Sequence, residues 1–516
     1  MPLTEYQQRA VDAVRGSIFT TSMLLVGGAG TGKSRTAVAI VKALAKATDC
    51  LILVVCAAAA PLDKYRSHFP EHGTEYLNVR VLTLQSLVGI KPSELATGFP
   101  TRTFKQIAKV GGSRFGPIPD TKKVVLVVEE CFAASSELVN QAMQSLALLP
   151  HAGRSAGNVH ALLVGCPHQM AAVGGSCVFH ADVFHDAMRP VRRLVLTENK
   201  RCANASAGFL RLLHLLRYWL ALGISALREA DAELIGMSQR GLPRGDSWID
   251  SVKLTATNAA ASRLNAQEAT LRYRRGEGTV IFMGYEGNLS EPEHFREPAS
   301  NLHAVLWMGD AVVAHPGGVD AVALDDDNVV TKIPNSAKIQ ITQLSTQRGI
   351  EFANQPDDTH LYIRCDDLPS AVIFVKYGGR AYRIDALHEK NSITKEMTHF
   401  MPITMMGAIT INRAQGQDIS GRVCIMMHGV LLPNVIDHVY TALTRATSEA
   451  DIYLAGYEPG SIVKAGEMLL QDTNPSAETF RAATKAIDRV ELAQIKSLQP
   501  KDSPPETSGR KRRRRE

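Results

Sequence analysis

The strongest constraint on the fold is a glycine-rich stretch that lies between an apolar run and an amphipathic stretch. Residues 27–34 read GGAGTGKS, which has the G-x-x-x-x-G-K-[ST] spacing of a phosphate-binding P-loop. The apolar run 23–26 predicts a short buried strand, and 36–47 predict a helix whose first N–H groups favour an anion. A plain glycine turn is the alternative. The spacing predicts a nucleoside triphosphate bound by these eight residues: Gly27, Gly28, Ala29, Gly30, Thr31, Gly32, Lys33 and Ser34.

Two side chains of this stretch have separate chemical roles. Lys33 would supply a positive charge to the β- and γ-phosphates, and Ser34 would place a hydroxyl on Mg²⁺.

Apolar runs rich in β-branched residues indicate the surrounding architecture. They occur at 51–55, 124–128 and 159–164, with helical segments between them. Strands that are apolar throughout are buried on both faces, as in parallel sheets, so we expect an α/β fold. Residues 63–120 are richer in Pro, Gly and charge, which favours an inserted subdomain or loops. A β-rich region follows at about 304–384, and a polar helical region begins after about 460.

Composition is that of a large globular chain. The 516 residues suggest roughly three or four domains. The eight cysteines form no C-x-x-C pair, which is typical of buried thiols in a reducing compartment. The longest apolar run, 50–62, is too short to cross a membrane, so we expect a soluble intracellular protein without a membrane partner.

The basic character of the chain is concentrated at its end. The net charge is +6, and the last seven residues, which include Arg510–Arg515, account for five of these charges. Such a run is typical of nuclear import or of loose nucleic-acid contact, and a purely solubilising tail is the alternative.

Acidic and cationic side chains follow the predicted strands. The run 124–128 ends in Glu129 and Glu130, of which the first would bind Mg²⁺ and the second would orient the attacking water. Gln169 follows the run 159–164 and could sense the γ-phosphate. Arg201 and Arg445 could reach from a second lobe to neutralise charge on the transferred phosphate.

The order of these segments resembles superfamily one helicases, and most closely their PIF-like and RecD-like branch. LTEYQQ at 3–8 is similar to the adenine-reading motif, which implies that Gln7 contacts the base. LTLQSL at 82–87 resembles a segment that touches single-stranded DNA, GCPHQM at 165–170 resembles the Gly-Asp-x-x-Gln-Leu motif, and LTATN at 254–258 resembles the strand that opens the second motor domain. AITINRAQGQ at 408–417 is similar to Ala-x-Thr-Ile-His-Lys-Ser-Gln-Gly-Gln.

Several positions depart from the family pattern. Glu129 and Cys166 each stand where the family has Asp, and Asn412-Arg413 replaces His-Lys. The first two departures could slow hydrolysis. The segment 56–61 matches the family in position but not in residues. Residues 440–448 also resemble the helicase subunit of herpesvirus helicase–primase complexes.

The resemblance implies a fold and an activity. Two RecA-like lobes with parallel sheets would occupy 1–195 and 196–303 with 400–460, with a wedge inserted at about 63–120. An SH3-like β insert would occupy 304–399, and 461–516 would be a C-terminal extension. Lobe one would supply most site residues, and lobe two Arg201 and Arg445. The candidate DNA contacts are Thr83, Gln85, Ser86, Thr410, Arg413 and Gln415.

The implied function is an ATP- and Mg²⁺-dependent DNA helicase that runs 5′ to 3′ on single-stranded or forked DNA. It would act in replication, recombination or repair in the nucleus, and a primase is a candidate partner. Two alternatives stay open: a viral-type RNA helicase or RNA-dependent ATPase, and a nucleotide-binding DNA scaffold with weak or no hydrolysis.

Overall fold

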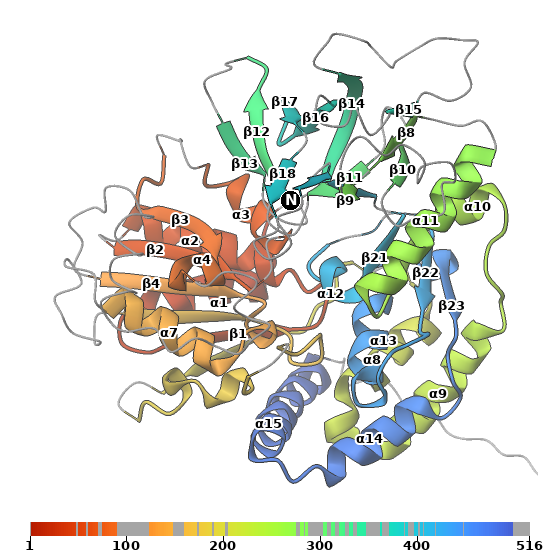
Figure 1. The fold of residues 1–516 in the computed structure, drawn as a ribbon. Helices are drawn as coiled ribbons and strands as arrows, with labels where there is room; N and C mark the ends of the chain where they lie inside the picture. Colours follow the sequence, from red (N-terminus) through yellow and green to blue (C-terminus); the bar gives the residue numbers. More distant parts are fainter. Residues whose placement is uncertain are drawn as a thin grey trace, which may run out of the picture.

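The structure is a computed structural model with two α/β lobes and a β-rich insert (Figure 1). It describes residues 2–47, 50–57, 60–70, 75–89, 123–147, 159–172, 175–187, 190–201, 205–274, 279–282, 284–286, 303–306, 311–314, 319–325, 330–333, 338–346, 362–363, 371–385, 387–390, 397–400, 403–405, 407–417, 419, 421–446 and 448–498. Among these residues no helix combines the length and the apolar character needed to cross a membrane.

The first lobe, red to yellow in Figure 1, is built on a parallel sheet with the order β3-β2-β4-β5-β1-β6 in the described part of the chain. Its strands are β1 (Met23–Gly27), β2 (Cys50–Cys56), β3 (Val79–Thr83), β4 (Lys123–Glu129), β5 (Val159–Gly165) and β6 (Arg192–Leu196). Its α-helices are α1 (Glu5–Ser17), α2 (Lys33–Ala47), α3 (Asp63–Arg66), α4 (Leu84–Val88) and α7 (Ser136–Ala147). Short 3-10 helices are η1 (Ala60–Leu62), η2 (Cys131–Ala133), η4 (Val178–His180) and η5 (Asp182–Phe184).

Alternate residues of each strand enter two separate cores. Leu25, Val54 and Val127 pack with α1 and α2 on one face. Leu24 and Leu126 pack with α4 and α7 on the other face. Burial on both faces is why the strands are apolar throughout, as the sequence predicted.

The parallel pairing brings the ends of the strands together. Strands β1, β2, β3, β4, β5 and β6 all pair in parallel, so their carboxyl ends lie along one edge of the sheet. The P-loop, the two glutamates and the loop after β5 all start from this edge, where open α/β sheets bind their ligands.

The second lobe has a smaller parallel sheet with the order β21-β7-β22-β23 among the described strands. Its strands are β7 (Val252–Thr255), β21 (Ala408–Thr410), β22 (Val423–Met426) and β23 (Ile452–Ala455). Its helices are α8 (Ala207–Leu222), α9 (Ile224–Ser238), α10 (Asp246–Ile249), α11 (Asn258–Arg274), α12 (Ile411–Ala414), η8 (Leu432–Asn434), α13 (Val435–Leu443), η9 (Glu449–Asp451), α14 (Ser461–Gln471) and α15 (Pro475–Leu498). Cys166 and Met170 of the first lobe pack into its core, so the two lobes share a buried junction.

A β-rich region interrupts the second lobe between α11 and β21. Its largest sheet has the order β13-β12-β17-β16-β14-β11-β20 and is antiparallel. The described strands of the whole β-rich region are β8 (Thr279–Phe282), β9 (Gly284–Glu286), β10 (His303–Leu306), β11 (Ala311–Ala314), β12 (Val319–Ala323), β13 (Val330–Ile333), β14 (Lys338–Thr346), β15 (Tyr362–Ile363), β16 (Ala371–Tyr377), β17 (Arg380–Asp385), β18 (Leu387–Lys390), β19 (Met397–Phe400) and β20 (Ile403–Met405). The described strands extend beyond the predicted range 304–399 at both ends, and the SH3-like class stays a prediction.

The described part of the predicted wedge belongs to the first lobe. β3 is an edge strand of the first sheet, and α4 lies in the core beside α7. Polar composition therefore misassigned 63–70 and 75–89. Residues 90–122 lie outside the described residues, as does the basic tail Arg510–Arg515.

The cysteines of the described part are thiols, and all but Cys177 are buried, as their apolar surroundings predicted.

Candidate active site

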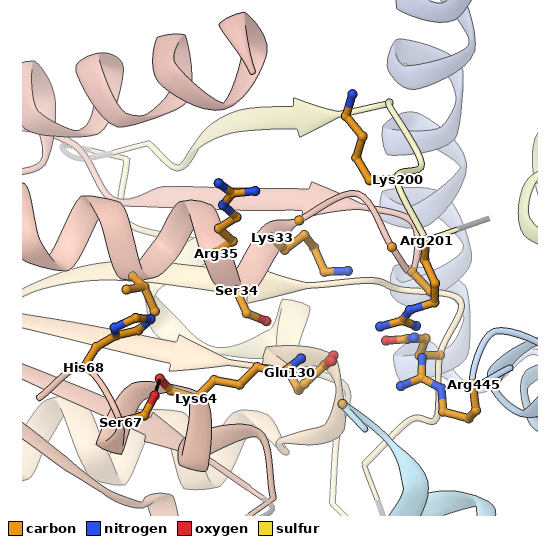
Figure 2. A pocket seen from close by; sticks show the side chains of 16 residues that line it. Lys33, Ser34, Arg35, Lys64, Ser67, His68, Glu130, Lys200, Arg201 and Arg445 are labelled. Atoms are coloured by element: carbon orange, nitrogen blue, oxygen red, sulfur yellow. Dashed lines mark hydrogen bonds between the residues drawn. The ribbon is translucent and has the colours of Figure 1, made fainter. Parts of the chain in front are cut away.

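A cavity of about 540 Å³ lies at the junction of the two lobes (Figure 2). The P-loop and the ends of β4, β5 and β6 border it from the first lobe, and the segments after α12 and α13 border it from the second. The lining residues are Ala29, Gly30, Gly32, Lys33, Ser34, Arg35, Val38, Lys64, Ser67, His68, Glu130, Gln169, Lys200, Arg201, Gly416 and Arg445.

The P-loop turns sharply between β1 and α2. Gly30 and Gly32 adopt φ values of +81° and +82°, which side chains other than glycine rarely tolerate. The Lys33 ammonium is buried inside this turn and donates to the carbonyl oxygens of Gly27 at 3.0 Å and Gly28 at 3.1 Å. The loop therefore carries a fixed positive charge beside the N-terminus of α2, which suits a polyphosphate.

Gln7 supports the P-loop from behind. It forms a capping box with Thr4 at the start of α1, and its Nε2 donates to the carbonyl oxygen of Thr31 at 3.2 Å. Four of the predicted nucleotide-binding residues do not line the cavity themselves: Gln7, Gly27, Gly28 and Thr31. They contact other residues of the P-loop, which does line the cavity. A contact between Gln7 and an adenine base stays a prediction.

Glu129 is held by two hydroxyl groups. Ser34 Oγ donates to its Oε1 at 2.5 Å, and Tyr65 O–H donates to its Oε2 at 2.7 Å. Burial and the neighbouring charge of Glu130 hold the pKa of Glu129 above its usual value, although the two hydrogen bonds act in the opposite direction. Burial, together with Glu129, raises the pKa of Tyr65 well above its usual range, so this phenol stays a donor. Ser34 and Glu129 thus present adjacent hard oxygen ligands of the kind that Mg²⁺ prefers.

Glu130 has an unusual backbone conformation that directs its side chain into the cavity. Its φ of 49° and ψ of 48° lie in the left-handed region, which costs about 1–2 kcal/mol for a residue with a Cβ. Strain of this kind is concentrated at functional sites.

Gln169 connects this acid to the second lobe. With its amide nitrogen facing Glu130, it donates to Glu130 Oε2 at 3.2 Å and accepts from Arg445 Nη2 at 2.8 Å. Gln415 approaches the same carboxylate oxygen, with its Nε2 at 3.4 Å. The candidate base is therefore linked to both lobes.

The two arginines lie on the side of the cavity opposite Ser34 (Figure 2). Arg445 is 1% exposed, and its guanidinium also donates to the carbonyl oxygens of Thr441 and Gln417. Arg201 Nη1 donates to the carbonyl oxygen of Thr444 at 2.6 Å. Arg201 follows β6 of the first sheet, and the preceding residue, Lys200, donates its N–H to the P-loop carbonyl of Gly30. Arg201 thus extends from the first lobe, not from the second as the sequence suggested.

Other cavity residues were not identified from the sequence. Lys64 lies on α3, next to Tyr65, and its ammonium points toward Glu130 (Figure 2). No sequence motif pointed to either residue, because the composition of this stretch favoured an insert. Arg35, Ser67, His68 and Lys200 line the cavity as well. Gly416 lies inside the motif at 408–417, and its place in that motif could have pointed to it.

The candidate DNA contacts lie on two similar turns, one in each lobe. Thr83 is the last residue of β3 and caps α4 by accepting from Ser86 N–H, and Thr410 is the last residue of β21 and caps α12 by accepting from Arg413 N–H. Both threonines have extended φ/ψ values, −71°/150° and −73°/150°. Burial lowers the pKa of Arg413 to about 10, which leaves its guanidinium charged at neutral pH.

Two of the candidate DNA contacts have other partners. Gln85 Nε2 donates to the carbonyl oxygen of Ala57 at 2.9 Å. Gln415 is buried and faces Glu130. Contact with DNA stays a prediction for all six residues.

Comparison with solved structures identifies the fold. The crystal structure of Pif1 helicase from Candida albicans matches with a TM-score of 0.59 and 16% identity over 91% of this chain and 99% of that one. A structure of Pif1 helicases that describes DNA unwinding at forked duplex DNA matches at 0.56 and 16%, over 92% and 98%. Bacteroides Pif1 in complex with ADP-AlF3 and single-stranded DNA matches at 0.53 and 15%, over 92% and 98%. No family model and no curated protein sequence matches the chain.

The fold is therefore that of the Pif1 helicases: two RecA-like lobes with a β insert. This confirms the α/β, two-lobe architecture predicted from the sequence. The neighbours named here are fungal or bacterial where their source is given, and the resemblance to a herpesvirus subunit stays a prediction.

Proposed function

We propose that this chain is an ATP-dependent DNA helicase that couples hydrolysis to movement along single-stranded DNA. The observation that carries the proposal is the composition of the cavity. Lys33, Ser34 and Glu130 of one lobe meet Arg445 of the other around a single space. The fold shared with Pif1 helicases, of which one was solved with ADP-AlF3 and single-stranded DNA, supports it.

Nucleotide binding follows from the P-loop chemistry. The backbone N–H groups of the loop and the Lys33 ammonium would hold the phosphates, and Ser34 and Glu129 would hold Mg²⁺. A bound Mg²⁺ would neutralise part of the charge on the phosphate oxygens. The cavity volume falls within the range of small-molecule and cofactor sites.

Hydrolysis needs an oriented water molecule and stabilisation of the developing negative charge. Glu130 is the candidate base, and its contact with Gln169 fixes where its carboxylate lies. Arg201 and Arg445 would stabilise the charge on the transferred phosphate, and Lys64 adds a further cation.

Movement follows from the shared site. Arg445 and Gln415 belong to the second lobe, so a γ-phosphate that they help to hold would favour closure of the lobes. Its loss after hydrolysis would favour opening, because a ligand shifts an equilibrium only by its differential affinity. Turns at Thr83 and Thr410 would hold the strand through its phosphates, with Arg413 as a cation.

The proposal also covers the direction of movement, the DNA structure, the cellular process, a partner and the location. Translocation from 5′ to 3′, action on forked DNA in replication, recombination or repair, a primase partner and nuclear localisation through Arg510–Arg515 are parts of it.

A strand-displacement assay tests the proposal. Duplexes with a 5′ or a 3′ single-stranded tail, of DNA or of RNA, are incubated with ATP and Mg²⁺, and Lys33→Ala serves as the control for contaminating activity. We expect displacement of the DNA duplex with a 5′ tail only. Displacement of RNA alone would favour the RNA helicase. ATP binding without turnover or displacement would favour the scaffold.

A further inference from the structure

The last described helix, α15, lies below and between the two lobes (Figure 1). Ile487 enters the core of the first lobe, and Phe480 packs on Phe179 with ring centroids 6.0 Å apart. The helix also packs along α8 of the second lobe. It follows all of the sequence motifs that resemble helicases, and nothing in the proposed function uses it.

One carboxylate of α15 pairs with an arginine that lies beside the P-loop. Glu491 Oε2 accepts from Arg217 Nη2 at 2.6 Å, and their side chains are 1% and 5% exposed. Arg217 Nη1 lies 2.7 Å from Cys166 Sγ and 3.4 Å from the hydroxyl of Tyr440. A Cβ on Gly28 would lie only 3.5 Å from the same guanidinium. Arg217 thus contacts the segment after β5 and α13, and its guanidinium lies beside Gly28 of the P-loop.

A second carboxylate, one turn away on the same face of α15, reaches the loop after β5. Asp488 Oδ1 lies 2.7 Å from His168 Nε2, and their side chains are 0% and 5% exposed. His168 directly precedes Gln169, which links the candidate base to Arg445. Among the described residues, the other oxygen of Asp488 has no hydrogen-bond partner.

These two buried pairs are costly by themselves. Removing the charges of Arg217 and Glu491 from water is unfavourable, and apolar replacements of both partners are often equally stable. An unpaired oxygen on Asp488 adds to this cost. Two such pairs on one helix, each ending at a segment that lines the cavity, fit a role in fixing geometry better than a role in stability.

We propose that Asp488 and Glu491 are positioning residues of the nucleotide site, so that α15 clamps the P-loop and the Gln169 loop from behind. This inference rests on the proposed ATPase function. The two carboxylates act on different steps. Glu491 acts through Arg217 on the P-loop, which binds nucleotide, and Asp488 acts through His168 on Gln169, which serves hydrolysis.

The test uses the full chain with two neutralising variants, Glu491→Gln and Asp488→Asn. Glu478→Gln, an exposed acid on the same helix, is the matched control. DNA-stimulated ATP turnover gives kcat and KM, titration with fluorescent ADP gives nucleotide affinity, and thermal melting reports folding. A displacement of about 1 Å at a reacting group can cost up to about a hundredfold in rate.

We expect Glu491→Gln to weaken ADP binding and raise the KM for ATP by about tenfold, and Asp488→Asn to lower kcat by about tenfold with KM nearly unchanged. Lower melting temperatures with unchanged kcat, KM and ADP affinity would overturn the proposal, because they show a purely structural helix.

If Glu491→Gln does not fold, the double variant Arg217→Met/Glu491→Leu removes both charges and keeps the packing. It should show the same loss of ADP affinity, and wild-type affinity would refute the role of Glu491. If wild-type protein shows no ATP turnover, the helicase proposal fails, whereas the ADP titration still decides the role of Glu491.

Discussion

Replacing Tyr65 by Phe removes one hydroxyl group from behind the candidate Mg²⁺ site. Tyr65 O–H donates to Glu129 Oε2 at 2.7 Å, and both side chains are buried. Glu129 is one methylene longer than the family's Asp. This hydroxyl, together with Ser34, therefore determines where the longer carboxylate lies. Tyr65→Phe keeps the ring and its packing, so the loss of one hydrogen bond is the main change.

The expected magnitude follows from this geometry. A hydrogen bond to a charged group contributes about 1.5–3 kcal/mol, and a buried acceptor left without a donor costs a similar amount. A free energy of 1.4 kcal/mol corresponds to a factor of ten in an equilibrium constant. We therefore expect Tyr65→Phe to raise the Mg²⁺ concentration for half-maximal turnover by about ten- to a hundredfold. The free energy of unfolding should fall by about 1–3 kcal/mol.

Two assays check this prediction. ATP turnover is measured against Mg²⁺ concentration, and Mn²⁺ binding in the presence of ADP is measured by electron paramagnetic resonance. Tyr453→Phe, in a strand of the second lobe, is the control for loss of a tyrosine hydroxyl elsewhere. Unchanged Mg²⁺ dependence and unchanged Mn²⁺ affinity in Tyr65→Phe would refute the idea that this hydroxyl positions Glu129.

Three further predictions concern single side chains. Lys64→Ala should lower kcat by about tenfold, because it removes a cation that points toward Glu130, whereas Lys42→Ala should leave kcat unchanged. Gln415→Ala should reduce the stimulation of ATP turnover by DNA at least about fivefold while basal turnover persists, and equal loss of both would contradict its role in linking the lobes. Burial lowers the pKa of His438, so the unfolded chain binds a proton more readily, and the free energy of unfolding should fall as pH drops below about 6.5. His438→Asn should weaken this dependence in thermal melts at pH 7.5 and 5.5, and an identical pH dependence would exclude His438 as its source.

Local sequence patterns predicted the first lobe well. The continuous apolar runs at 51–55, 124–128 and 159–164 form β2, β4 and β5, because strands in the middle of a parallel sheet have no polar face. The P-loop spacing located the turn between β1 and α2, because phosphate binding by this loop depends on residues that are adjacent in the sequence.

Contacts between distant residues could not be predicted in the same way. Arg217 of α8 is buried against Glu491 of α15, 274 positions away, and no local pattern reports such a pair. Tyr65 was missed because it bonds to a residue 64 positions away. The polar composition of 63–89 concealed β3, whose burial as an edge strand is only partial.

The central claim is that this cavity drives a motor on single-stranded DNA. The most direct test measures ATP turnover by the full chain with single-stranded DNA, with single-stranded RNA and with no nucleic acid, each beside Lys33→Ala. We predict that DNA stimulates turnover well above the other two conditions and that Lys33→Ala abolishes it. Turnover that ignores DNA, or that responds to RNA alone, would contradict the claim.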